Sequence, residues 1–295
     1  MTENRVFATG EHVFQIGDNS TLHYTVHGTG PLIIVLPPAW GIGSQYLQDG
    51  LASLYGSYTL LFLELRGNGK SSRPPPSQMT SWHLAEDVEF LRQELKLERI
   101  PCLMSHSGGG TAALWYAIRF PEKVENLVLL NHQLEGFDDS ESMKAIVQQK
   151  QKDPELRPAL DAWTASWDDA SDEEFATFFR TFLPVYFYDP NSCDKVPSLK
   201  TISHIPVWNY HLLHGKNASQ RSQETELDLV KARTLLIFAT DDPICTPTQG
   251  TATKNAITGS KMVVYDKCGH FPWVEKEEEV IKDLQEFFPG IHSLH

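Results

Sequence analysis

The sequence predicts an α/β fold in which helices flank a mostly parallel β-sheet and a helical segment is inserted between two strands. Three observations lead to this prediction. Short, continuously apolar segments recur along the chain, which is typical of strands buried on both faces of a sheet. Segments with apolar residues at helical spacing lie between them, and this alternation favours parallel strands. One long segment breaks the alternation and predicts the insertion.

The strands can be taken in chain order. Two segments with alternating apolar residues, 13–16 and 22–26, flank a turn cluster at 17–19 and predict a hairpin. Continuously apolar segments then predict buried strands at 32–36, 59–63, 127–130, 234–238 and 262–265. A further short strand is expected at 101–104, directly before a run of small residues.

Helices are expected between these strands. Residues 82–97 carry apolar side chains at positions 84, 88, 91 and 95, which form one face of a helix. Residues 109–119 are small and apolar and stop at Pro121, and residues 274–288 combine apolar positions with charges. These segments supply the helices that cover the sheet.

Residues 135–228 interrupt the alternation. They contain no long apolar strand, many aromatic residues, and 17 acidic against 9 basic residues. Their amphipathic stretches, such as 173–183, have helical spacing. The sequence therefore predicts an α/β core in two parts, 1–134 and 229–295, with a helical cap insertion at 135–228.

Composition limits the classes of partner. The 295 residues carry a formal net charge of -13, which argues against nucleic acid and against anionic membrane surfaces as partners. No apolar run approaches the roughly 18 residues of a membrane span, and the first residues do not resemble a signal peptide. The four cysteines, which have no C-x-x-C spacing, favour reduced thiols and a cytoplasmic location.

The segment Ser105-His106-Ser107-Gly108-Gly109 is the strongest indication of chemistry. It follows a short strand and precedes a helix of small residues, which is the pattern of a nucleophile elbow. The sharp turn requires small residues two positions before and after the nucleophile, and Ser105 and Gly109 meet this requirement. The sequence therefore predicts Ser107 as the nucleophile, at a helix N-terminus that favours developing negative charge.

A serine nucleophile needs a base and an acid that orients the base. His270 follows the last predicted strand, where a loop can hold a histidine over the sheet. Asp241 and Asp242 follow the preceding strand, and Asp241 is expected to cap the next turn. The order Ser107, Asp242, His270 is the one that accompanies a nucleophile elbow.

On these motifs the chain resembles the α/β-hydrolase family, in particular its proline iminopeptidase-like branch, over nearly the whole sequence outside 135–228. The resemblance implies the α/β-hydrolase fold. It also selects Asp242, because the acid of that family ends a Gly-x-x-Asp pattern and Ala239 occupies the glycine position. The family motif Asp-x-Arg-Gly-x-Gly-x-Ser is matched at residues 64–71, with Glu64 in the first position. The glycines of this segment lack the spacing of a phosphate-binding loop, so nucleotide binding is not expected.

The resemblance also implies an oxyanion hole. The family has a His-Gly motif after the third strand, where this chain has Pro37-Pro38, and proline has no N–H to donate. The first amide after the prolines is that of Ala39, at the position that the family uses; Trp40 is the alternative if the register shifts by one. The second expected donor is the amide of Gly108. Trp40 and His106 are the candidate substrate-binding residues, although the position of His106 is expected to be mainly structural.

These residues predict a metal-free serine hydrolase without a cofactor, acting on an ester, lactone or amide bond. The substrate is expected to be a small molecule or a short peptide, and the leading candidates are a peptide with an N-terminal proline and a small ester or lactone. His204, His211 and His214 lack a carboxylate or cysteine at ligand spacing, so they do not predict a metal site.

Two other classes stay open. The same fold hosts non-hydrolytic lyases and cyclases, and it also hosts ligand-sensing proteins that retain the triad but turn over slowly. The aromatic and acidic composition of 135–228 predicts an apolar substrate and leaves open a positively charged end. In iminopeptidases of this branch, acids of the cap bind the free amino terminus of the substrate, but no acid of this segment can be matched to that role.

Overall fold

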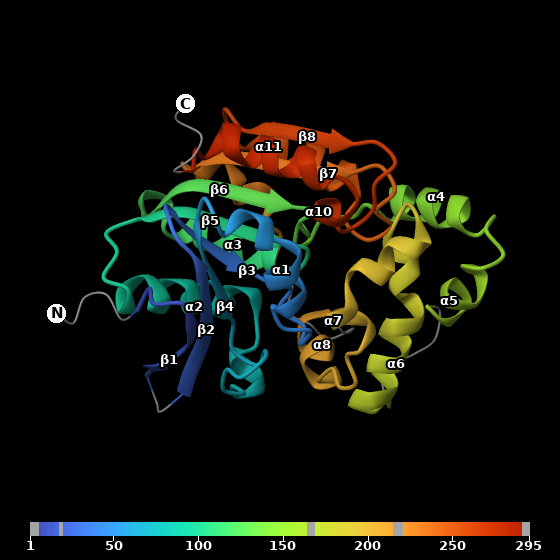
Figure 1. Ribbon diagram of the computed structural model, residues 1–295, viewed down its shortest axis with the longest axis horizontal. Coiled ribbons are helices and arrows are strands. Elements are labelled where there is room, and N and C mark those ends of the chain that lie inside the picture. Colours follow the sequence, from blue (N-terminus) through green and yellow to red (C-terminus); the bar gives the residue numbers. More distant parts are fainter. Residues whose placement is uncertain (1–5, 18–19, 164–168, 215–220, 291–295) are drawn as a thin grey trace.

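The structure is a computed structural model that describes residues 6–17, 20–163, 169–214 and 221–290. Its eight-stranded sheet has the order β1-β2-β4-β3-β5-β6-β7-β8 (Figure 1). The strands are β1 (Gly10–Ile16), β2 (Ser20–Gly28), β3 (Leu32–Leu36), β4 (Thr59–Glu64), β5 (Ile100–His106), β6 (Val124–Leu130), β7 (Arg233–Ala239) and β8 (Lys261–Tyr265). The pairs β1–β2 and β2–β4 are antiparallel, and the remaining pairs are parallel. The predicted hairpin and the mostly parallel sheet are therefore confirmed.

Helices cover both faces of this sheet. They are α1 (Gln45–Gly50), α2 (Ser81–Glu94), α3 (Gly109–Arg119), α9 (Pro247–Ala256), α10 (Pro272–Glu275) and α11 (Glu277–Phe287). One hydrophobic core lies under α2, α3 and α9, and a second lies under α1, α10 and α11. Within β3, Ile34 belongs to the first core and Ile33 and Val35 to the second. This alternation explains why the strand reads as continuously apolar, since successive side chains point to opposite faces.

Two helices differ from the expectation. The predicted helix 274–288 is divided at Lys276, whose φ of -137° lies outside helical values, so α10 ends at Glu275 and α11 begins at Glu277. Helix α9 was not predicted because it has few apolar residues. Its start is marked by Pro247 and by the Thr246 hydroxyl, which accepts a hydrogen bond from the amide of Thr248.

The segment between β6 and β7 forms helices and, among its described residues, no strand. These helices are α4 (Ser140–Lys150), α5 (Arg157–Ala162), α6 (Asp172–Phe182), α7 (Pro197–Lys200) and α8 (Val207–His214). Short 3-10 segments lie here and elsewhere, at Ala52–Leu54, Pro76–Gln78, Pro121–Lys123, Leu183–Tyr186, Pro190–Lys195 and Glu224–Leu229. We call residues 135–228 the insert; its residues 164–168 and 215–220 lie outside the described ranges. Figure 1 shows the helices of the insert on the side toward which the arrowheads of β6, β7 and β8 point.

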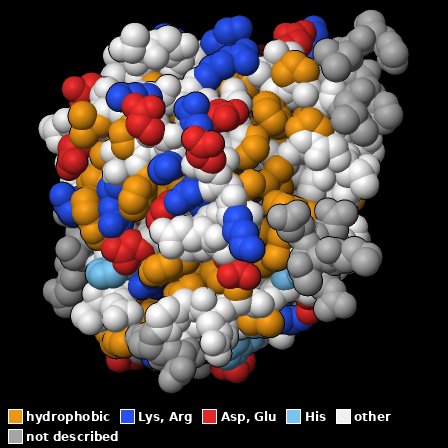
Figure 2. Space-filling model, turned by 90° about the vertical axis from the view of Figure 1, so that its left-hand side faces the viewer, with side chains coloured by type: hydrophobic (Ala, Val, Ile, Leu, Met, Phe, Trp, Pro, Cys, Tyr) orange, Lys and Arg blue, Asp and Glu red, His pale blue; other side chains and the backbone are white. Residues whose placement is uncertain are grey.

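Two surface properties bear on the expected partners. None of the helices that the structure describes combines the length and the apolar character needed to cross a membrane. Figure 2 shows the face that includes the β1 and β2 side of the sheet, where acidic and basic side chains are interspersed. Nucleic-acid binding requires a concentrated positive field, and the described residues of this face do not form one.

Candidate active site

Ser107 occupies the sharp turn from β5 into α3. Its φ is 53°, in the left-handed region that residues other than glycine rarely adopt. The Ser107 amide donates a hydrogen bond of 3.1 Å to the carbonyl of Leu130, and the Ser107 carbonyl accepts from the amides of Gly110 and Gln133. The end of β6 and the first turn of α3 therefore hold the strained backbone in place.

The residues on either side of the turn are small for a reason that the packing makes plain. A Cβ atom on Gly109 would lie 2.5 Å from the carbonyl oxygen of Pro37, which no real contact allows. Ser105 is fully buried, and its hydroxyl has no hydrogen-bond partner among the described residues. A larger side chain at either position would push the elbow away from the neighbouring strand.

The loops after β7 and β8 bring Asp242 and His270 together. A hydrogen bond of 2.7 Å joins His270 Nδ1 to Asp242 Oδ2, and both side chains are buried. The second oxygen of Asp242 accepts from the amides of Ile244 at 2.8 Å and Cys245 at 3.1 Å. Asp241 instead accepts a bond from the hydroxyl of Thr240. The structure thus pairs His270 with Asp242, and it is Asp242, not Asp241 as expected, that accepts hydrogen bonds from the amides of the following turn.

The His270 loop is packed tightly against the insert. The His270 amide donates a hydrogen bond of 2.6 Å to the carbonyl of Tyr186. A Cβ on Gly269 would lie only 2.1 Å from that same carbonyl oxygen, so only glycine fits there. The ring of Tyr186 also lies against the imidazole of His270, with 5.2 Å between the centroids. The position of His270 therefore depends on the insert as well as on β8.

His106 contacts Tyr46 and the backbone of His270. A hydrogen bond of 2.6 Å joins its Nδ1 to the hydroxyl of Tyr46, and its Nε2 is 2.9 Å from the carbonyl oxygen of His270. Burial, with a smaller contribution from His270, lowers the pKa of His106 well below its usual value. His106 is not among the residues that line the cavities next to Ser107. The structure therefore places it as a support of the His270 backbone and not at the cavity wall, where it was expected to bind substrate.

Cys245 is a neighbour of the Ser107 turn that sequence reasoning did not assign to the site. Its sulfur and the ligand-type atoms of Asp242 and His270 all lie within 4.8 Å of one another. Burial and the charge of Asp242 raise the pKa of the Cys245 thiol well above its usual value, while a hydrogen bond from Ser107 acts in the opposite direction. One buried sulfur thus adjoins Ser107, Asp242 and His270.

Asn131 and Gln133 are two further neighbours that the sequence did not reveal. Asn131 Nδ2 donates a hydrogen bond of 2.6 Å to Asp242 Oδ2. The backbone amide of Gln133 donates a hydrogen bond of 3.0 Å to the Ser107 carbonyl. Both residues directly follow β6, and the carboxyl end of a strand in an open α/β sheet is the general position of ligand sites. That position was the only signal that could have drawn attention to them.

The amides of Ala39 and Gly108 have the environment expected of oxyanion donors. Neither amide donates a hydrogen bond within the described parts of the chain. The two loops that carry them adjoin, because a Cβ on Gly108 would lie 3.5 Å from Cδ1 of Trp40 and 3.8 Å from Cβ of Pro38. Unpaired N–H groups at a cavity wall are costly unless water or a ligand accepts them, so both amides are available to bind an anionic oxygen.

The segment 64–71 holds the loop of Ala39 and Trp40 from below. Glu64 Oε1 accepts hydrogen bonds from the amide and the hydroxyl of Ser44, at 2.9 and 2.5 Å. Asn68 Oδ1 accepts from the amide of Gly41 at 2.7 Å and from the side chain of Asn209 in the insert at 3.3 Å. The motif that the sequence shares with the α/β-hydrolase family therefore has a positioning role here.

The main cavity lies between Ser107 and the insert and has a volume of about 400 Å³. Its wall is predominantly aromatic, formed by Trp40, Phe137, Trp163, Phe175, Phe178, Phe179, Phe182, Tyr186 and Tyr210. Asp138 and Asp139 are the carboxylates among its described lining residues. Asp139 accepts hydrogen bonds from the side chains of Thr246 and Gln249, and Asp138 accepts one from the amide of Ser140. The cavity suits an apolar substrate.

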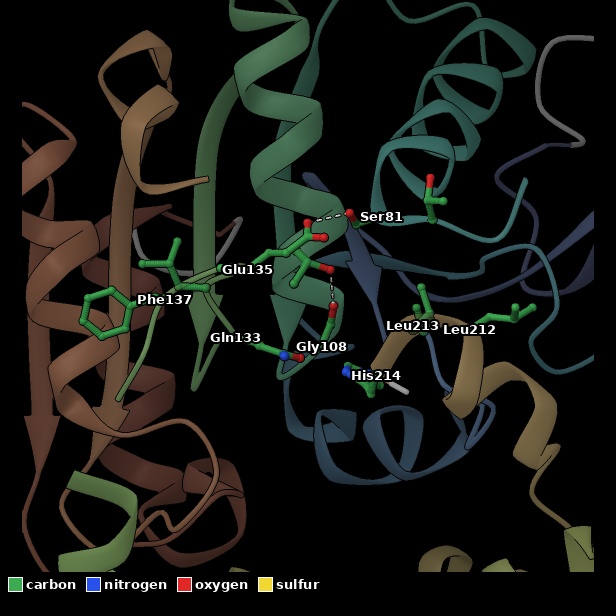
Figure 3. Close-up of a pocket in the computed structure, with 13 residues that line it drawn as sticks. Ser81, Gly108, Gln133, Glu135, Phe137, Leu212, Leu213 and His214 are labelled. Carbon is green, nitrogen blue, oxygen red and sulfur yellow. Dashed lines mark hydrogen bonds between the residues drawn. The ribbon is translucent and has the colours of Figure 1, made fainter. Parts of the chain in front are cut away.

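A second cavity, of about 90 Å³, lies beside the candidate oxyanion hole (Figure 3). Ala39 and Gly108 line it on one side, and α8 lines it through Leu212, Leu213 and His214. Glu135 is fixed at its inner end, where Oε2 accepts hydrogen bonds of 2.5 Å from Ser81 and 2.6 Å from the indole of Trp115. Four residues line both cavities and form the boundary between them: Gln133, Leu134, Phe137 and His214. The volume and polar wall suit a few water molecules beside the two amides.

Among the described residues, one group of side chains has the geometry to hold a metal ion: Asp242, Cys245 and His270. Two of these groups already satisfy each other through the hydrogen bond at 2.7 Å. His204, the first of the three histidines considered from the sequence, is exposed and adjoins Asp172 at 3.2 Å and Glu173 at 3.4 Å. Burial lowers the pKa of His214 to about 4.

Comparisons with known proteins agree with the observed fold. The sequence model of the α/β hydrolase fold matches residues 33–277. The proline iminopeptidase PfmaB of Pestalotiopsis fici is 24% identical over 277 residues, covering 91% of this chain and 96% of that protein. The structure of a proline iminopeptidase from Mycobacterium smegmatis superposes with a TM-score of 0.73 at 19% identity, covering 95% and 97% of the two chains. An esterase from Exiguobacterium antarcticum gives a TM-score of 0.72 at 17% identity, covering 95% and 99%.

Proposed function

Because the chain belongs to the α/β hydrolase fold family, we propose that it is a metal-free serine hydrolase that cleaves an ester, lactone or amide bond through an acyl-enzyme. Ser107 is the proposed nucleophile, His270 the base and Asp242 the acid of the triad. The amides of Ala39 and Gly108 form the proposed oxyanion hole. No cofactor takes part in this reaction.

In the first half of the proposed reaction, His270 takes the proton of the Ser107 hydroxyl while the oxygen attacks the carbonyl carbon. Asp242 keeps the proton on Nδ1, so that Nε2 is the basic nitrogen, and it stabilises the imidazolium that forms. Negative charge develops on the former carbonyl oxygen, which the amides of Ala39 and Gly108 bind. One such donor is worth about 2.7–4 kcal/mol of transition-state stabilisation.

In the second half, the imidazolium of His270 gives its proton to the leaving group. A water molecule then attacks the acyl carbon while His270 takes one of its protons; His270 returns this proton to the Ser107 oxygen as the bond between that oxygen and the acyl carbon breaks, and the acyl group leaves as an acid. Two hydrogen bonds of the His270 backbone support this cycle: its amide donates to the carbonyl of Tyr186, and its carbonyl lies 2.9 Å from Nε2 of His106. They hold the imidazole in one position through both halves, which preserves the alignment that proton transfer needs.

One observation carries the proposal. The hydrogen bond of 2.7 Å between Asp242 and His270 is buried, and the sulfur of Cys245 adjoins this pair as well as Ser107. The turn at Ser107 does not need a buried carboxylate–imidazole pair next to it in order to fold. Acyl transfer by a serine, in contrast, requires such a pair.

We further propose that the insert, residues 135–228, is a cap that selects the substrate. It supplies most of the aromatic wall of the main cavity, which Ser107 also lines. Trp40, from the core, lies across from this wall and packs edge-on against Phe179 with 5.5 Å between the ring centroids. Trp40 is therefore the proposed substrate-binding residue of the core.

The predominantly aromatic wall suits an apolar ester or lactone. A free amino terminus would have to meet Asp139, which accepts two hydrogen bonds on Oδ2, or Asp138, which accepts one on Oδ1. The known relatives include proline iminopeptidases and the structural neighbours include an esterase, so both substrate types are reasonable tests. Hydrolysis of simple esters without hydrolysis of prolyl amides would support the ester; the reverse would favour the iminopeptidase.

Labelling with a fluorophosphonate tests the triad directly. The wild-type protein should be labelled, and Ser107→Ala should lose labelling together with ester hydrolysis. Ser105→Ala is the matched control, because Ser105 is buried two residues away and its hydroxyl has no partner among the described residues. Undiminished labelling of Ser107→Ala would overturn the assignment. Incorporation of ¹⁸O from water into the product separates hydrolysis from lyase or cyclase chemistry, which would leave the product unlabelled.

A further inference from the structure

A third cavity, of about 380 Å³, continues outward from the main cavity along one face of α4. Ser140, Met143, Val147 and Gln151 line it at helical spacing, and Trp163 forms the opposite wall. From Ser140 to Gln151 the helix rises about 16 Å, at about 1.5 Å per residue. We call this feature the α4 groove.

The α4 groove and the main cavity meet at three residues. Ser140, Met143 and Trp163 line both of them. The ring of Trp163 packs on Phe182, with 5.1 Å between the centroids, and Phe182 also belongs to the aromatic wall. Apolar side chains thus extend from the neighbourhood of Ser107 to the outer turns of α4.

The chemistry of the α4 groove favours a hydrocarbon chain as its occupant. Met143 and Val147 are half-buried, although they lie on a helix whose other side chains are mostly in water. The polar lining residues are Ser140, Lys144, Gln148 and Gln151, all of them exposed, and no carboxylate lines the groove among the described residues. An alkyl chain gains from contact with the less exposed side chains Met143, Val147 and Trp163, while the polar side chains keep their contact with water.

We propose that the α4 groove binds the extended apolar chain of an ester substrate whose carbonyl lies at Ser107, with Met143 and Trp163 forming the passage from the main cavity. This inference rests on the proposed esterase function and specifies its substrate class. The chain belongs to the acyl group or to the alcohol of the ester, and both give the same contacts.

A series of p-nitrophenyl esters tests the acyl chain: acetate, butyrate, octanoate and dodecanoate. In the wild-type protein, kcat/KM should rise by roughly tenfold or more from butyrate to octanoate, since each buried methylene favours binding. In Met143→Trp, kcat/KM for octanoate should fall to about that for acetate, with butyrate as the reference in both cases. Val147→Trp lies one helical turn further out and should lower only the dodecanoate to octanoate ratio. This graded response is what a groove of defined direction predicts.

Ala145→Trp is the matched control, because Ala145 is exposed on the opposite face of α4, and it should keep the wild-type profile. Alkyl acetates of the same chain lengths form the second arm. If the variants change only the p-nitrophenyl series, the chain is acyl; if they change only the acetates, it belongs to the alcohol.

Equal kcat/KM across chain lengths, or unchanged ratios in Met143→Trp and Val147→Trp, would overturn the proposal. In that case butyrate turnover that depends on Ser107 would still support the esterase. If the proposed esterase function itself is wrong, the wild-type protein should turn over none of these esters.

Discussion

Asn131 Nδ2 donates a hydrogen bond of 2.6 Å to Oδ2 of Asp242, the same oxygen that is bonded to His270. With the two backbone amides on its other oxygen, the Asp242 carboxylate accepts four hydrogen bonds. A buried carboxylate without such partners would be strongly destabilising. Asn131 adopts a φ of 40°, which asparagine tolerates better than most residues. Its amide and its backbone are therefore both suited to this position.

Asn131→Gly should lower kcat about tenfold with little change in KM. A hydrogen bond to a charged group contributes about 1.5–3 kcal/mol, and part of that loss reaches the transition state, because Asp242 is then less firmly held against His270. Glycine accepts the left-handed backbone without strain, so the effect reports the lost amide. Initial rates on p-nitrophenyl butyrate measure it.

Asn126→Ala provides the control for that measurement. Asn126 lies in β6 far from the site and donates a hydrogen bond of 2.8 Å to the carbonyl of Pro101. Its loss should reduce stability and leave kcat unchanged. Wild-type kcat in Asn131→Gly would contradict a positioning role for Asn131.

Gly269→Ala should lower both activity and stability. Its added methyl group would lie 2.1 Å from the carbonyl oxygen of Tyr186, so the His270 loop and the insert must move apart. Overpacking of this kind typically costs about 1–3 kcal/mol, which urea unfolding measures, and displacement of His270 should lower kcat at least tenfold. At Gly56, by contrast, an added Cβ meets nothing within 4 Å. Gly56→Ala should therefore keep wild-type activity, and similar behaviour of the two variants would count against the close packing.

The four cysteines should be unreactive in the folded protein. All four are free and buried. Burial raises the pKa of each thiol, and the charge of Asp242 adds to the effect at Cys245. Because the thiolate is the reactive form, a disulfide reagent at pH 8 should titrate no thiol in native protein and four after denaturation. Rapid inactivation by iodoacetamide at pH 8 would show that the thiol next to Ser107 is accessible and ionised.

Local patterns in the sequence predicted the fold and the order of the candidate triad because their physical causes are local. A strand buried on both faces must be continuously apolar, as Ile33, Ile34 and Val35 are. A sharp turn at Ser107 requires small neighbours in the adjacent sequence positions. Asn131, in contrast, meets Asp242 across 111 positions of the chain, and no local pattern marks such a pair.

The sequence does not show in which direction some side chains near the site point. His106 adjoins Ser107 in the chain, yet it is the last residue of β5, and successive strand residues point to opposite faces. The spacing of the Phe175, Phe178, Phe179 and Phe182 side chains predicts one face of a helix, but not whether that face meets the core or a cavity. The structure shows that all four line the main cavity.

Glu64→Gln should change how stability depends on pH. Burial raises the pKa of Glu64, although the hydrogen bonds from Ser44 act in the opposite direction. The folded protein therefore holds this proton more tightly than the unfolded chain. The stabilisation is complete below the ordinary glutamate pKa of 4.5 and is lost as the pH rises through the higher folded-state pKa.

Glutamine cannot ionise, and its amide nitrogen can replace Oε2, which has no partner among the described residues. Urea unfolding at a series of pH values should show the variant gaining stability relative to wild type as the pH rises above the ordinary glutamate pKa of 4.5. Glu11→Gln should behave oppositely, because the exposed ion pair with Lys70 lowers the pKa of Glu11. In that variant a small loss of stability should appear near neutral pH and vanish in acid. A Glu64→Gln curve parallel to the wild-type curve would mean that Glu64 is ionised at no cost in the folded state.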